Sequence, residues 1–208
     1  MNIYCIEQNY LSHKRERNEN KNEPIVFLKP GSSLLPNGMD LHFEEPETFK
    51  LYAQCEIVLK ISSDGKDIPE AEAEKYFDSI STGINFTRIN IHDELSGAIV
   101  KWEEAKAWNN SSSIGEWFDA ADFAKNPHDI NFCLYKNREM EQMGNTDLMI
   151  FDLKKIISLV SSQYALKKDD IIFTGSPLGI CEVFEGDKLE AFLEDDSALE
   201  FGIVNQQS

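Results

Sequence analysis

A histidine and a glutamate lie three residues apart near the start of the chain, at His13 and Glu16. On a short helix, side chains at this spacing share one face, so the carboxylate can orient and charge the imidazole. Such a pair is typical of a general base that activates a water molecule. The alternative is that both side chains face solvent and have no chemical role.

Two lysines stand where a positive charge could hold a substrate. Lys29 ends an apolar stretch and precedes Pro30, so it can point into a cleft and bind a carboxylate. Lys106 lies four residues after Trp102, which places both side chains on one face if this segment is helical. Each lysine also has a plain interpretation, because many lysines are solvated while their alkyl chains cover apolar surface.

The sequence TGSPLG at residues 174–179 predicts a tight turn after an apolar strand. Its glycines and proline favour a turn that exposes backbone N–H groups and two hydroxyl groups. Such a turn can bind a carboxylate, with Thr174 and Gly175 as candidate contacts. Taken alone, the same residues also suit an ordinary turn.

The surrounding pattern predicts the elements that position these residues. Short apolar or β-branched runs predict strands, whereas a proline start or helical spacing predicts helices. The predicted strands are residues 3–6, 25–28, 56–61, 80–91, 170–173 and 188–192, and the predicted helices are residues 69–75 and 148–160. Strands outnumber helices and come in clusters, which indicates an α+β, mostly β fold.

Charge and composition exclude several classes of function. The 208 residues carry a net charge of −17, which would repel the phosphates of nucleic acid. No apolar run approaches the roughly 20 residues that span a bilayer, and the first ten residues lack a signal-peptide pattern. We therefore expect a cytoplasmic protein that binds neither nucleic acid nor membrane. The four widely spaced cysteines are expected to be buried free thiols.

Three motifs together resemble the fumarylacetoacetate hydrolase family: NYLSHKRE at residues 9–16, EPIVFLKP at 23–30 and DIIFTGSPLG at 170–179. The resemblance covers nearly the whole chain. It implies a single domain over residues 1–208 with the mixed β-sheet roll of that family, a lid at residues 9–22 and a homodimer. Family members act on small oxo or dioxo acids as hydrolases, isomerases or decarboxylases, so a small oxo-acid ligand is implied. The implied catalytic residues are His13, Glu16 and Lys106, and the implied substrate-binding residues are Lys29, Gln142, Thr174 and Gly175.

The resemblance also places a divalent-metal site on Gln54, Glu56 and Asn85. The family supplies two acids two residues apart on one strand, which therefore share a face, and an aspartate from a later strand. Here only Glu56 keeps a carboxylate, while Gln54 and Asn85 offer carbonyl oxygens. Since Mg²⁺ sites usually include carboxylates, binding of Mg²⁺ or Mn²⁺ is expected to be weak or absent.

Two functional hypotheses follow from these motifs. The first is an enzyme of the hydrolase, isomerase or decarboxylase type with an altered metal site, supported by the retained lysines and the His13–Glu16 pair. The second is a catalytically inactive relative that serves as a binding or partner protein, supported by the losses around the metal position. Further departures from the family pattern are Glu7, Ile89, Asn90 and Glu141.

Overall fold

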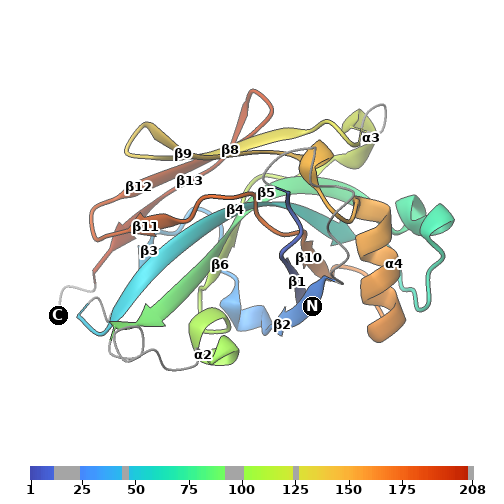
Figure 1. Ribbon diagram of the computed structural model, residues 1–208, viewed down its shortest axis with the longest axis horizontal. Helices are drawn as coiled ribbons and strands as arrows, with labels where there is room; N and C mark the ends of the chain where they lie inside the picture. The colour runs from blue at the N-terminus through green and yellow to red at the C-terminus, as the bar shows by residue number, and fades with distance from the viewer. Residues whose placement is uncertain (12–23, 44–46, 92–100, 124–126, 206–208) are drawn as a thin grey trace.

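Strands dominate the protein and form two mixed sheets, with short helices around them (Figure 1). The computed structural model describes residues 1–11, 24–43, 47–91, 101–123 and 127–205. The expected α+β, mostly β class is confirmed. Every predicted strand overlaps an observed strand, and the observed central strands extend beyond the apolar runs that predicted them.

The larger sheet has eight strands, with its two longest at the centre. Its main path runs through β2 (Ile25–Lys29), β1 (Ile3–Glu7), β10 (Ile171–Phe173), β4 (Phe49–Ile61), β5 (Phe77–Asn90) and β6 (Ser112–Ile114). In addition, β11 (Cys181–Val183) pairs with β4, and β7 (Phe118–Asp119) pairs with β5. Strands β1 and β10 are parallel, whereas β4 and β5 are antiparallel with Gln54 opposite Asn85. This register brings the three predicted metal ligands onto neighbouring strands.

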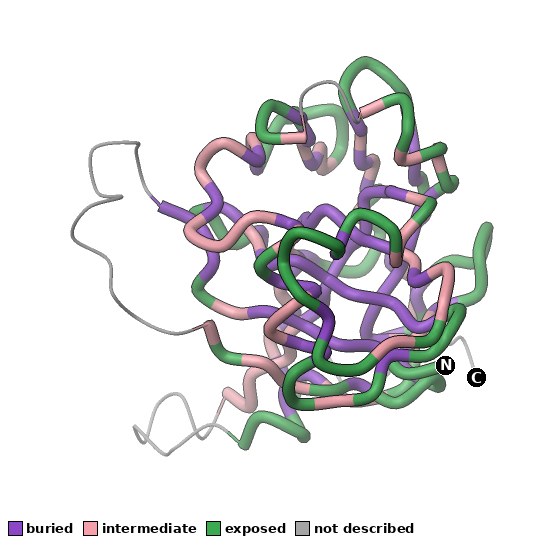
Figure 2. Tube along the Cα trace, turned by 90° about the vertical axis from the view of Figure 1, so that its right-hand side faces the viewer, coloured by how far each residue is buried: buried purple, intermediate pink, exposed green. Residues whose placement is uncertain are grey.

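The smaller sheet has five strands and packs on the larger one. Its order is β3 (Leu41–His42), β13 (Asp196–Val204), β12 (Lys188–Leu193), β8 (Asn131–Lys136) and β9 (Glu139–Asn145). Strands β12 and β13 contact β5, and β8 contacts β4. Buried and less buried residues alternate along β12, as a strand with one face on a core requires. The inward side chains form an apolar core, visible as the buried centre in Figure 2.

The helices are short and lie outside the sheets (Figure 1). Helix α4 (Leu153–Gln163) begins after Asp152, whose side chain accepts from the Lys155 backbone N–H at 2.9 Å. It starts later than predicted because η4 (Thr146–Leu148) is a separate 3-10 turn. The helix predicted after Pro69 is a 3-10 helix, η3 (Glu70–Tyr76). Further helical segments in the described residues are η2 (Gly31–Ser33), α2 (Trp102–Lys106) and α3 (Ala120–Phe123). Within the described ranges, every helix is too short or too polar to cross a bilayer.

An interruption along one edge of β4 positions the candidate site. Strand β5 pairs with β4 along its whole length, but on the other edge β10 pairs only with residues 58–60 and β11 only with residues 51–53. The chain between β10 and β11, residues 174–180, leaves the sheet over this interval. Backbone groups of residues 54–57 on that edge must therefore find partners outside a regular strand pair.

Candidate functional site

Glu56 lies in the interrupted interval of β4 and is almost completely buried. Its Oε1 accepts a hydrogen bond from Asn85 Nδ2 at 2.8 Å, and its Oε2 accepts one from the Gly175 backbone N–H at 2.7 Å. Burial, aided by the nearby Glu7 carboxylate, raises the pKa of Glu56 to about 7, although both hydrogen bonds oppose the change. A carboxyl group of this kind can take up or release a proton near neutral pH.

Lys106 ends helix α2 and brings an ammonium group to the same interval. Its Nζ forms an ion pair with Glu7 Oε1 at 2.5 Å and donates to Gln54 Oε1 at 3.3 Å. The ammonium also lies 5.7 Å from the ring centroids of both Phe27 and Trp102. Trp102 and Lys106 do lie on one short helix, α2 (Trp102–Lys106), and the lysine is buried.

Gln54 connects this lysine to the loop that follows β10. Its Nε2 donates to Ser176 Oγ at 2.8 Å, while its Oε1 accepts from Lys106. Because residues two apart on a strand share a face, Gln54 and Glu56 point to the same side of β4. We name these side chains the carboxylate–lysine cluster, which consists of Glu7, Gln54, Glu56, Asn85 and Lys106.

Lys29 ends β2 and is only 1% exposed. Its Nζ donates to the Ser111 carbonyl oxygen at 2.7 Å, to Ser112 Oγ at 3.0 Å and to Ser111 Oγ at 3.2 Å. These contacts use the three hydrogens of an ammonium group, so Lys29 anchors the start of β6. Burial lowers the pKa of Lys29 to about 7. Its contact with a substrate stays a prediction.

Gln142 on β9 joins the smaller sheet to β4 and to the loop. Its Oε1 accepts from the Cys55 backbone N–H at 2.7 Å. Its Nε2 donates to the carbonyl oxygens of Pro177 at 3.0 Å and Gly179 at 2.7 Å. The side chain thus satisfies a backbone donor that the interrupted edge of β4 would leave unpaired. Substrate binding by Gln142, expected from the resemblance, stays a prediction.

Asn9 fixes the start of the 174–180 loop from the other side. Its buried Nδ2 donates to the carbonyl oxygens of Thr174 at 2.8 Å and Phe151 at 3.0 Å. The Thr174 hydroxyl donates to the Ile57 carbonyl oxygen at 2.9 Å. Gly175 has a φ of +97°, and a Cβ there would lie 2.8 Å from Asn9 Cβ, so glycine fits this close approach. These contacts hold the loop in place, and substrate roles for Thr174 and Gly175 stay predictions.

The predicted water-activating residues His13 and Glu16 lie outside the described residues, as does most of the expected lid at residues 9–22. Residues 9–11 are described and pack beside residues 148–151. Tyr10 bridges to Met149, and the Leu11 N–H donates to the Leu148 carbonyl oxygen at 3.0 Å. Of the predicted site residues that the structure describes, Asn85 and Gly175 donate directly to Glu56, while Lys106 donates to the neighbouring Gln54.

The side chains of the carboxylate–lysine cluster do not form a cation cage. Among the described residues, no group of three or more His, Cys, Asp or Glu side chains could hold a metal ion. Asn85 turns its NH₂ group toward Glu56, and the ammonium group of Lys106 contacts Oε1 of Glu7 and Oε1 of Gln54. The buried Asn85 Oδ1 has no hydrogen-bond partner among the described residues, but one amide oxygen is a poor substitute for the lost carboxylates. As these side chains stand, the donor set does not fit a divalent ion.

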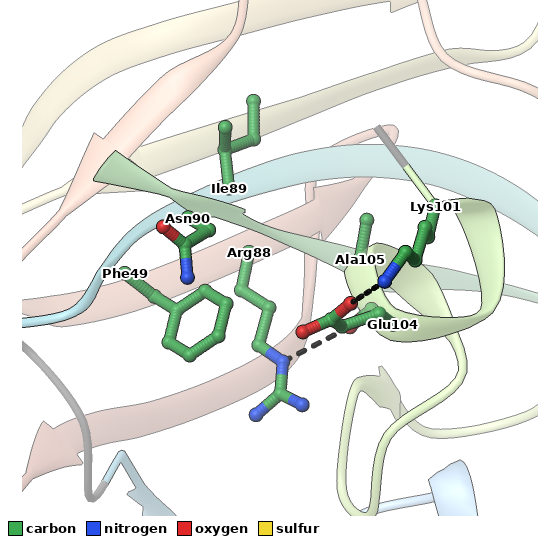
Figure 3. Close-up of a pocket in the computed structure, with 7 residues that line it drawn as sticks. All are labelled: Phe49, Arg88, Ile89, Asn90, Lys101, Glu104 and Ala105. Carbon is green, nitrogen blue, oxygen red and sulfur yellow. Dashed lines mark hydrogen bonds and ion pairs between the residues drawn. The ribbon is translucent and has the colours of Figure 1, made fainter. Parts of the chain in front are cut away.

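A separate hollow lies on the other side of α2, between this helix and the ends of β4 and β5 (Figure 3). Arg88 stacks there at 4.7 Å from the centroid of the Phe49 ring, and its Nε donates to the Glu104 carbonyl oxygen at 3.0 Å. Ile89 and Asn90, which depart from the family pattern, line the same hollow. Its lining includes no member of the carboxylate–lysine cluster.

Comparison with known proteins settles the family. The family model described as fumarylacetoacetate (FAA) hydrolase C-terminal matches residues 2–207. The chain belongs to the fumarylacetoacetate hydrolase family. Within this family, the chain is 32% identical to the oxaloacetate tautomerase FAHD1, mitochondrial, of Homo sapiens, over 91% of this chain and 86% of that protein. It is 31% identical to the oxaloacetate tautomerase FAHD2, mitochondrial, of Oryza sativa subsp. japonica, over 99% and 92% of the two chains.

Solved structures of fumarylacetoacetate hydrolase family members share the fold. One is the fumarylpyruvate hydrolase from Pseudomonas aeruginosa in complex with Mn²⁺ and pyruvate, with a TM-score of 0.84, 25% identity, and coverage of 99% of this chain and 90% of that chain. Another is the 5-carboxymethyl-2-hydroxymuconate delta-isomerase from Mycobacterium smegmatis, with a TM-score of 0.87, 21% identity, and coverage of 100% and 80%. The second likeness concerns the fold, whereas the first also shows a family member that binds Mn²⁺.

Three residues of the site were missed or given no role from the sequence. Glu7 was noted only as a departure from the family pattern, although it is the ion-pair partner of Lys106. Asn9 and Ser176 had no predicted role. Both lie inside motifs that carried the resemblance, NYLSHKRE and DIIFTGSPLG, and that position was the available signal.

Proposed function

We propose that this family member acts on small oxo or dioxo acids, as a hydrolase, isomerase or decarboxylase with an altered, weak divalent-metal site. The observation that carries the proposal is the carboxylate–lysine cluster. It brings a buried carboxyl group and a buried lysine together beside the 174–180 loop, where one edge of β4 lacks a neighbouring strand. Relatives named for oxaloacetate and fumarylpyruvate support this substrate class.

In this proposal, each polar group of the site has a distinct task. Lys106 provides the positive charge that holds a substrate carboxylate, and Glu56 exchanges a proton with the substrate. His13 and Glu16 activate water, as the family resemblance implies. The proposed substrate-contacting residues are Lys29, Gln142, Thr174 and Gly175.

We propose that Mg²⁺ or Mn²⁺ binds weakly or not at all, through Glu56 with help from Gln54 and Asn85. Charge is the physical reason. The carboxylates of Glu7 and Glu56 act against burial to raise the pKa of Lys29, and the ammonium group of Lys106 acts to lower that of Glu56, so two formal negative charges already stand near two formal positive charges. A divalent cation would add two uncompensated positive charges to a buried site.

Calorimetric titration of the metal-stripped protein with Mg²⁺ and Mn²⁺ tests this proposal. The natural protein should bind in the millimolar range or not at all, and the double variant Gln54→Glu/Asn85→Asp should bind at least about 100-fold more tightly. The control Gln163→Glu/Asn37→Asp adds the same two charges at exposed positions and should behave like the natural protein. Micromolar binding by the natural protein would show that the weak-site proposal is wrong.

A second candidate function is a catalytically inactive paralogue that serves as a binding or partner protein. The favouring observation is that the charged groups find partners inside the cluster, because Asn85 donates to Glu56 and Glu7 neutralises Lys106. Turnover of oxaloacetate and fumarylpyruvate, with millimolar Mn²⁺ present, separates the candidates. Turnover by the natural protein supports an enzyme. Turnover by the Gln54→Glu/Asn85→Asp variant alone supports the inactive paralogue.

We also propose a homodimer, as the family resemblance implies. Four apolar side chains near the site are more than half exposed: Met143, Leu178, Ile180 and Phe184. Lys136 connects β9 to the chain after β11, since its Nζ lies 3.6 Å from Glu141 Oε1 and 6.0 Å from the centroid of the Phe184 ring. A second copy would remove this apolar surface from water. Sedimentation analysis should show a dimer that Leu178→Glu weakens and the control Met39→Glu, at another exposed methionine, does not.

The cytoplasm is our proposed compartment for this family member. The names of the human and rice relatives carry the word mitochondrial, so mitochondria are the alternative compartment to test. Imaging of the tagged full chain tests the proposal, and co-localisation with a mitochondrial marker would contradict it.

A further inference from the structure

In the ion pair between Lys106 and Glu7, the lysine side chain has several other contacts and the glutamate carboxylate has none among the described residues. Lys106 has three other contacts, with Gln54 Oε1 and with the rings of Phe27 and Trp102. In the part of the chain that the structure describes, the Glu7 carboxylate contacts Lys106 alone. Its side chain is also the more exposed of the two, at 18% against 8%. If the pair opens, the ammonium group therefore stays in place and the carboxylate moves away.

We propose that Lys106 is a metal-independent binding position for the carboxylate of a small oxo acid, which Glu7 occupies in the ligand-free protein. The inference rests on the proposed function and deepens it, because it names the group that binds the substrate class and the internal group that competes. A carboxylate ligand makes the same charge-assisted contact as Glu7. The exchange leaves the charge around the buried ammonium unchanged, whereas a divalent cation would raise it.

Ser176 provides a second donor beside this position. Its Oγ accepts from Gln54 Nε2 at 2.8 Å, and the same amide accepts from Lys106 through Oε1 at 3.3 Å. The hydroxyl hydrogen of Ser176 has no acceptor among the contacts of the described residues. Lys106 and Ser176 thus contact the two ends of the Gln54 amide group. A small acid with two oxygens can accept a hydrogen bond from each of them.

Calorimetry with pyruvate and oxalate as probes, in metal-free buffer, tests the inference. The natural protein should bind weakly, and Glu7→Gln should bind about tenfold more tightly because the internal competitor is removed. Lys106→Met should abolish binding in either background. The exposed pair of Lys188 and Glu200, at 2.6 Å, offers matched controls. Lys188→Met and Glu200→Gln should leave both affinities unchanged.

Two outcomes would overturn the inference. One is binding of pyruvate that requires added Mn²⁺, and the other is a Glu7→Gln variant, folded by circular dichroism, that binds no more tightly than the natural protein. Failure of the proposed function looks different. Metal-free binding without turnover of any oxo acid would support the binding position at Lys106 and contradict the enzymatic function. Turnover without metal-free binding would support the enzymatic function and contradict the binding position.

Discussion

Gln142 offers the sharpest test of how the site is held together. Its amide makes three hydrogen bonds, to the Cys55 N–H and to the carbonyl oxygens of Pro177 and Gly179, at 2.7 to 3.0 Å. Each contributes about 1 kcal/mol net, and Gln142→Leu also leaves the buried Cys55 N–H unpaired, at a further cost of about 1–3 kcal/mol. Since leucine regains some apolar burial, we expect a net loss of about 4 kcal/mol in the free energy of unfolding.

Urea denaturation followed by tryptophan fluorescence measures this loss. Thermal unfolding provides a second measurement. For a chain of this size, a loss of about 1 kcal/mol lowers the Tm by about 2–4 °C, so the Tm of Gln142→Leu should fall by roughly 10 °C. The control Gln163→Leu makes the same chemical change at an exposed position and should stay within about 0.5 kcal/mol. A loss below about 1 kcal/mol for Gln142→Leu would refute the reasoning. It would show that the loop is held by other contacts and leave ligand binding as the main role of Gln142.

Three further predictions concern the same region. Gly175→Ala should lower the free energy of unfolding by about 2–3 kcal/mol in urea denaturation, which is more than for Gly38→Ala. Both glycines have positive φ, but only Gly175 faces a neighbouring side chain. Equal losses for the two variants would contradict the contact argument. The raised pKa of Glu56 means that its stabilising contribution is full below pH 4.5 and falls as pH rises to about 7. The stability of the natural protein minus that of Glu56→Gln should thus drop by up to about 1.4 kcal/mol per pH unit in that window, and a flat difference would refute the shift. The lowered pKa of Lys29 predicts the opposite dependence of stability on pH. Relative to Lys29→Met, the natural protein should gain stability from pH 7 to 9, as the buried ammonium loses its proton, and a pH-independent difference in urea denaturation would contradict this.

Much of the architecture followed from local sequence pattern. Apolar and β-branched runs predicted strands such as β1 and β10 because a strand covered on both faces buries consecutive residues. The prediction was less exact for helices. The helix after Pro69 is a 3-10 helix. The helix expected from residue 148 begins at Leu153, because η4 ends at Leu148 and Asp152 caps the helix.

For the site, the chain by itself determined which chemical groups were available and which family they resemble. The alternation of a strand placed Gln54 and Glu56 on one face, and helical spacing placed Lys106 beside Trp102. Only the tertiary structure decided what those groups contact. The break between β10 and β11 gave Cys55 its partner in Gln142, and the fold brought Glu7 from β1 to Lys106 on α2. These pairings join residues 87 and 99 positions apart, and local patterns carry no information about them because they arise from the way the sheets and loops pack.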